Sequence, residues 1–152
     1  MRKTSLVIAL CTFGIGIGSA FAAGMPAAST AMSPSGAGMD VNQEINTALD
    51  HAQMAVAGQD VKTVHEHMQH VINCLVGPQG PEFDAKAEDP CKGMGNGAMN
   101  DVDSKSDKHK QLDKALTDAK DSLRKDSVKS AQSQAKSVVK ELQKAQSAKP
   151  TK

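Results

Sequence analysis

Two stretches of the chain repeat one pattern of apolar residues at a distance of 67 residues. In residues 40–76, apolar side chains recur at helical spacing in two segments separated by a turn, and residues 107–143 repeat both segments and the turn. A helical hairpin with one apolar face cannot bury that face alone. We therefore predict an all-α fold, a four-helix bundle made of two repeated hairpins. The coinciding pairs are Ile45 and Leu112, Ala48 and Ala115, Leu49 and Leu116, Ala52 and Ala119, Val61 and Val128, Val71 and Val138, Ile72 and Val139, and Leu75 and Leu142.

The apolar pattern has a second interpretation, because any two amphipathic hairpins place Ala and Val at helical spacing. The turns correspond as well, however, with Gly58-Gln59-Asp60 in the first hairpin and Lys125-Asp126-Ser127 in the second. This agreement favours a true repeat.

Capping residues indicate where the predicted helices begin and end. Asp40 and Asp60 are typical N-cap residues, and Gly77-Pro78 ends the second helix. These signals predict one hairpin over residues 40–76 and, through the repeat, a second over residues 105–147.

The first 22 residues have the features of an export signal. The basic pair Arg2-Lys3 precedes an apolar stretch over residues 6–18, and Ala20-Phe21-Ala22 fits the small-x-small cleavage pattern. A membrane span is the alternative, but the stretch is short for a hydrocarbon core of about 30 Å and is interrupted by glycines. We expect cleavage, a periplasmic or secreted protein, and no stable membrane insertion afterwards. Residues 23–39, rich in small residues, Pro and Gly, predict a flexible leader.

Two cysteines, Cys74 and Cys91, follow the predicted signal. In an oxidising compartment an even pair favours a disulfide. Because the chain has few large aliphatic side chains to bury, such a cross-link would add needed stability, about 3 kcal/mol for a loop of this size. The bond would also tether residues 77–104, a connection rich in Gly and Pro with Phe83 as its apolar anchor.

Composition and charge exclude several classes of function. The chain has no Trp or Tyr, and two of its three Phe fall in the predicted signal, so it lacks a stacking platform for nucleic-acid bases. A formal net charge of +1 argues against a groove that follows phosphates. No nucleophile stands beside a base at a recognisable catalytic spacing. We therefore expect neither nucleic-acid binding nor enzyme activity.

Four histidines fall in the first predicted hairpin: His51, His65, His67 and His70. Helical spacing places His67 and His70 on one edge of the second helix and His51 on the facing edge of the first. His65 falls on the other edge. Imidazoles from two antiparallel helices can surround one cation, and imidazole suits divalent Zn, Cu and Ni. The alternative interpretation is that these histidines only flank the core.

Further ligands are available near the predicted site. Asp50, Glu66, Met54 or water can complete the coordination shell. If reduced, the two cysteines would form a two-Cys, two-His zinc site with His67 and His70, although export favours the disulfide. The equivalent positions of the second hairpin hold no histidine, so the predicted site is confined to the first: they are Asp118, Gln132, Gln134 and Ser137.

Two runs of the first predicted hairpin carry a resemblance to a known family: Ala48-Leu49-Asp50-His51-Ala52-Gln53-Met54-Ala55-Val56-Ala57-Gly58 and Val64-His65-Glu66-His67-Met68-Gln69-His70-Val71. They resemble the small metal-binding proteins of the bacterial periplasm. Those are exported, His-rich helical-hairpin repeat proteins that bind divalent metals such as copper, nickel and zinc. The resemblance covers residues 40–76 and implies His51, His67, His70 and His65 as candidate ligands. The chain departs from the pattern in lacking the matching histidines in its second hairpin and in its Cys-bracketed loop.

Together these features predict a small exported protein that binds copper, nickel or zinc through hairpin histidines, for buffering or tolerance in the cell envelope. With fewer histidines than the family it resembles, the chain is expected to hold one or two ions. The alternative is a helical interaction or stress protein of the periplasm that binds no metal. In that case the basic second hairpin and the Cys-bracketed loop would contact an envelope protein partner.

Overall fold

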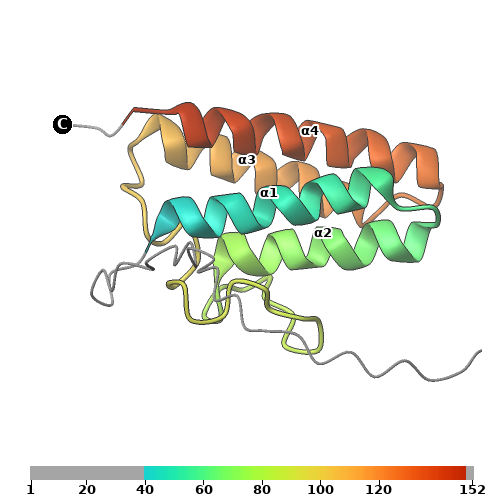
Figure 1. Cartoon of the computed structure of the whole chain (residues 1–152), viewed down its shortest axis with the longest axis horizontal. Helices are drawn as coiled ribbons and strands as arrows, with labels where there is room; N and C mark the ends of the chain where they lie inside the picture. The colour runs from blue at the N-terminus through green and yellow to red at the C-terminus, as the bar shows by residue number, and fades with distance from the viewer. Residues whose placement is uncertain (1–39, 150–152) are drawn as a thin grey trace, which may run out of the picture. The chain divides into compact units, whose positions relative to one another are not determined.

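The computed structural model describes residues 40–149, and all regular secondary structure in that range is helical (Figure 1). The helices are α1 (Val41–Ala57), α2 (Val61–Val76), α3 (Asp107–Ser122) and α4 (Val128–Ser147). The predicted all-α fold of two helical hairpins is thereby confirmed. The predicted signal and leader, residues 1–22 and 23–39, lie outside the described residues. Within the described part, every helix is too short or too polar to cross a membrane.

The helices form a bundle in which α1 packs beside α2 and α4, and α3 packs beside α2 and α4 (Figure 1). Short turns join α1 to α2 and α3 to α4, so the two helices of each hairpin run antiparallel. Between residues 40 and 149 the core holds 23 buried apolar residues, of which nine are alanines. Alanine lets helix backbones approach closely, which is how a chain with few large aliphatic side chains still fills a core.

Side-chain caps set the starts of the helices. Oδ1 of Asp40 accepts two backbone N–H groups of α1 at 3.1 and 3.3 Å, and Oδ1 of Asp60 accepts the N–H of Thr63 at 2.9 Å. In the second hairpin, Oγ of Ser106 accepts the N–H of His109 at 3.0 Å and α3 begins at the next residue after that serine. Each cap satisfies a donor that a helix leaves unpaired in its first turn.

The 67-residue repeat is visible both in the helix bounds and in the burial pattern. α2 begins at Val61 and α4 begins at its counterpart Val128. Six of the eight coinciding pairs are buried in both hairpins. In one further pair Ile72 is buried while Val139 is only partly buried against the core. The two hairpins therefore turn the same face inward, as the pattern predicts.

The connection from α2 to α3 is fastened to the end of α2. Cys74 and Cys91 form the predicted disulfide, with an S–S distance of 1.98 Å. The backbone N–H groups of Ala98 and Met99 donate to the carbonyls of Cys74 and Leu75, each at 3.0 Å. The last turn of α2 thus carries both a covalent and a hydrogen-bonded attachment of the loop.

A glycine at the end of α2 allows this close approach. Gly77 has a φ of 66°, and a Cβ added there would lie 1.8 Å from the carbonyl oxygen of Asn96. Any other residue would be strained at this φ and would push the loop away. Farther along the loop, the predicted anchor Phe83 is partly buried and packs against the core.

Candidate metal centre

The two helices of the first hairpin bring three histidines together. His51 lies on α1, whereas His67 and His70 lie one turn apart on α2. The turn between the helices is tight, because a Cβ added to Gly58 would lie 2.9 Å from Cγ2 of Val64. Glycine at this position therefore lets α2 pack closely on α1, and the facing edges predicted from helical spacing meet.

The three rings converge through their Nδ1 atoms. Nδ1 of His51 lies 3.3 Å from Nδ1 of His67 and 3.2 Å from Nδ1 of His70. The ring centroids are 5.5, 4.9 and 5.7 Å apart for the pairs His51–His67, His51–His70 and His67–His70. One nitrogen from each partly buried ring lies within 4.8 Å of the other two, which is close enough for the three to hold one metal ion.

The nitrogen spacings match those of a tetrahedral metal site. Two ligands bonded to zinc at about 2.0 Å and separated by the tetrahedral angle lie about 3.3 Å apart. The measured separations from His51 are 3.3 and 3.2 Å. A divalent ion can thus bind at His51 and either partner with little rearrangement, and the third imidazole is within reach.

The surroundings of His51 and His70 favour the uncharged, metal-binding form of their imidazoles. Burial lowers the pKa of His51 below its usual value, and the neighbouring His70 and His67 lower it further. Burial, followed by His67, likewise lowers the pKa of His70. A neutral imidazole keeps a lone pair for a metal, whereas an imidazolium does not. The lowered pKa values of His51 and His70 therefore favour the form of these two rings that binds a cation.

The fourth predicted histidine, His65, lies outside this cluster. Its Nε2 atom is 3.1 Å from the carbonyl oxygen of Lys125, in the turn between α3 and α4. It therefore fastens the first hairpin to the second. His109, at the start of α3, is also outside the cluster and is partly buried.

The other predicted ligands have different partners or surroundings. Oε1 of Glu66 lies 2.6 Å from Nζ of Lys62, and Asp50 is exposed. Met54 is 49% exposed. Since both cysteines are in the disulfide, they offer no thiolate, and a two-Cys, two-His site does not form in this state.

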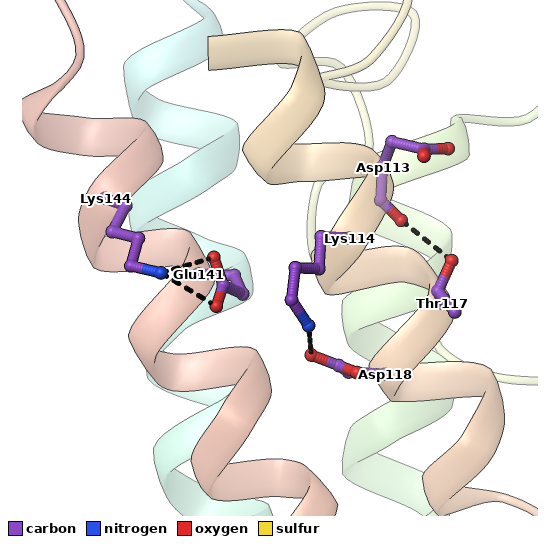
Figure 2. Close-up of polar contacts among 6 residues, drawn as sticks. All are labelled: Asp113, Lys114, Thr117, Asp118, Glu141 and Lys144. Carbon is purple, nitrogen blue, oxygen red and sulfur yellow. Dashed lines mark hydrogen bonds and ion pairs between the residues drawn. The ribbon is translucent and has the colours of Figure 1, made fainter. Parts of the chain in front are cut away.

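In the second hairpin, one position equivalent to the cluster carries an ion pair, and a second ion pair lies nearby on the neighbouring helix. Asp118, the counterpart of His51, has its Oδ2 atom 2.9 Å from Nζ of Lys114 on the same helix. On the neighbouring α4, Nζ of Lys144 lies 3.0 Å from both carboxylate oxygens of Glu141. Figure 2 shows these two pairs side by side on α3 and α4. Each charge there is already neutralised by a partner one helical turn away.

Sequence reasoning missed the residue that holds the loop beside the cluster, Asn73. This fully buried side chain donates from Nδ2 to the carbonyls of Asp84 and Glu88, at 3.1 and 3.2 Å, and its Oδ1 accepts the N–H of Asp84 at 3.0 Å. The signal was a lone amide within the apolar run of residues 71–76. A buried amide must find hydrogen-bond partners, and here the loop backbone supplies them.

A buried acid, Glu44, was missed as well. Its side chain is 1% exposed, and its Oε1 accepts the N–H of Gly97 at 3.0 Å, while Oε2 has no hydrogen-bond partner among the described residues. Burial, opposed by the hydrogen bond from Gly97 and aided by the nearby Asp101, raises its pKa to about 7. The signal was its position one helical turn before Ala48, on the apolar stripe of α1.

Comparison with known proteins finds no family model, no curated protein and no solved structure that matches this chain. The geometry and chemistry of the three histidines are therefore what supports a metal site.

Proposed function

We propose that this protein is exported and binds a divalent transition-metal ion, copper, nickel or zinc, through His51, His67 and His70. Binding at this site would buffer the metal in the periplasm. The observation that carries the proposal is the convergence of three Nδ1 atoms. Those of His67 and His70 lie 3.3 and 3.2 Å from Nδ1 of His51. Imidazole is a preferred ligand of all three metals, so the donor set defines a class of ion.

We propose one metal site, for one ion, among the described residues. The three histidines are the one group of His, Cys, Asp and Glu side chains between residues 40 and 149 with this spacing. One equivalent of metal in a partly buried site suits reversible binding, which buffering requires. Export is supported by the basic start, apolar stretch and cleavage pattern in residues 1–22.

Thermal unfolding with and without metal tests the proposal. An ion that binds only the folded chain raises the melting temperature. We expect Zn(II), Cu(II) or Ni(II) to stabilise the purified protein, and the double variant His67→Ala, His70→Ala to lose the effect. The matched control is Gln134→Ala, Ser137→Ala, which changes the equivalent positions of the second hairpin and should keep the full response. Binding no tighter than about 100 μM, about −5.5 kcal/mol, would rule out buffering.

Acid offers a second test of the same ligands. Protons compete with the metal for imidazole nitrogen, so affinity should fall as the pH drops below about 6.5. Because the pKa values of His51 and His70 are lowered, the loss should begin somewhat below that pH. Equal Zn(II) affinities at pH 7.5 and pH 5.5, measured by competition with a chelator, would exclude histidine ligation.

A further inference from the structure

The three histidines leave the fourth position of a tetrahedral site open. The loop between α2 and α3 borders the cluster on one side, where His70 and Glu88 line the same cavity of about 480 Å³. A ligand from the loop therefore has access to the cluster through this cavity.

We propose that Glu88 supplies the fourth ligand and completes a site of three imidazoles and one carboxylate. The inference rests on the proposed function and names the residue that makes the site selective for a divalent ion. It also gives the Cys-bracketed loop a role, which is to carry this carboxylate to the histidines.

The backbone of Glu88 is held beside the histidine-bearing part of α2. Nδ2 of Asn73 donates to the Glu88 carbonyl at 3.2 Å, and Asn73 lies one helical turn after His70. The disulfide from Cys74 to Cys91 fastens the same loop three residues farther on. Glu88 is thus restrained from both sides, while its side chain extends from a fixed point next to His70.

The carboxylate of Glu88 remains available for an ion. The residue is exposed, and within residues 40–149 its carboxylate takes part in no ion pair or hydrogen bond. Glu88 lines the same cavity as His70, whose ring belongs to the cluster. The shared cavity is the route by which the carboxylate reaches the histidines.

The competing carboxylate is Glu66, which lines the same cavity as His70 and Glu88. Its Oε1 atom is 2.6 Å from Nζ of Lys62, one turn earlier on α2. Binding a metal would require Glu66 to leave that pair. Glu88 has no such partner to leave, and this difference makes Glu66 a suitable control.

A carboxylate changes which ions the site prefers. Carboxylate oxygen binds Zn(II) at about 2.0 to 2.2 Å and neutralises part of its charge. Cu(I) is softer and has a single charge, so it gains less from an oxygen anion. We therefore expect Glu88 to strengthen Zn(II) binding and to leave Cu(I) binding nearly unchanged.

Zn(II), Co(II) and Cu(I) titrations of the full chain test the proposal. Glu88→Gln should weaken Zn(II) binding about tenfold or more and change the visible absorption of bound Co(II), which reports its ligand set. The control Glu66→Gln removes the same charge on α2 and should keep the wild-type Co(II) spectrum and Zn(II) affinity. Both variants should bind Cu(I) like the wild type.

The outcomes separate this inference from the proposed function. If the wild type binds no Zn(II), the proposed function fails. If the wild type binds Zn(II) but Glu88→Gln binds it equally well with an unchanged Co(II) spectrum, only the carboxylate ligand is overturned. Equal losses in Glu88→Gln and Glu66→Gln would also overturn it, because they would show an effect of charge at a distance.

Discussion

The two hairpins of this bundle share an apolar face and differ on their polar edges. α1 and α2 repeat in α3 and α4 with the same register of buried residues. At the site of the histidine cluster in the first hairpin, the second has Asp118 paired with Lys114 (Figure 2). Packing thus constrains the residue types on the buried face of each helix, whereas the residue types on the polar edge differ between the two hairpins. The first hairpin has three converging histidines there, and the second has one ion pair beside Gln134 and Ser137.

The fastening of the loop is a second difference between the hairpins. Cys74 and Asn73 hold residues 77–104 against the first hairpin, whereas the counterpart of Cys74 in α4 is Glu141, which pairs with Lys144. The histidine-bearing hairpin is therefore also the cross-linked one. This coincidence is what we expect if the loop takes part in the site.

The largest expected effect comes from removing the cross-link of the first hairpin. Cys74→Ser, Cys91→Ser should lower the free energy of unfolding by about 3 kcal/mol, because the unfolded chain gains freedom. Urea unfolding measures this change. Reductant should destabilise the wild type by a similar amount and leave the variant unaffected. Equal stability of oxidised and reduced wild type would contradict a structural role for the bond.

The next effect sharpens the comparison of His51 with its counterpart Asp118. His51→Ala removes the ring whose Nδ1 faces both other Nδ1 atoms, so Zn(II) affinity should fall about 100-fold, or about 2.7 kcal/mol. Asp118→Ala should leave the affinity unchanged. Isothermal titration of both variants gives the two numbers. Similar losses of Zn(II) affinity in the two variants would show that His51 is no more a metal ligand than Asp118.

Glu44 offers a test through pH, since its counterpart in the second hairpin is Gln111. Burial raises the Glu44 pKa from 4.5 to about 7, so the folded chain binds this proton more tightly than the unfolded chain. Its contribution to stability is complete below pH 4.5 and is lost as the pH rises through 7.

Glu44→Gln, which copies the second hairpin, should remove this dependence. Relative to the variant, the wild type should lose about 3 kcal/mol between pH 4.5 and pH 8. Urea unfolding in the presence of a chelator measures the difference and excludes metal effects. Parallel pH profiles of the two proteins would show that Glu44 titrates normally.

The smallest expected effect is a gain of function that would make the hairpins alike. Asp118→His, Gln134→His, Ser137→His places imidazoles at the positions equivalent to the cluster. A second equivalent of Zn(II) should bind, about tenfold more weakly, because Lys114 loses its partner and repels the ion. Titration stoichiometry gives the answer. A stoichiometry that stays at one would show that the polar edges of the two hairpins are not equivalent in geometry.

Much of the site follows from the sequence because it depends on local geometry. The spacing of 100° per residue places His67 and His70 on one edge of α2, and a short turn at Gly58 makes the edge of α1 with His51 face it. The disulfide follows from an even pair of cysteines. These inferences require only the helix and the turn.

The rest depends on contacts between distant parts of the chain. The partner of His65 is a carbonyl of Lys125, 60 residues away, which only the packing of the two hairpins brings near. The role of Asn73 depends on the path of an irregular loop that no periodicity describes. The burial of Glu44 depends on that same loop, through Gly97. Nothing in the sequence distinguishes Glu88 from other exposed acids. Its place in the cavity beside His70 depends on the contacts that hold the loop to α2.

The most direct test of the account is the ¹⁵N NMR spectrum of the histidine rings during a Zn(II) titration. If the three histidines bind the ion, the Nδ1 resonances of His51, His67 and His70 should shift together, and the shifts should be complete at one equivalent of metal. His65 and His109 serve as internal references and should keep their shifts. Shifts spread over all five rings, or none at the three clustered rings, would contradict a metal centre in the first hairpin.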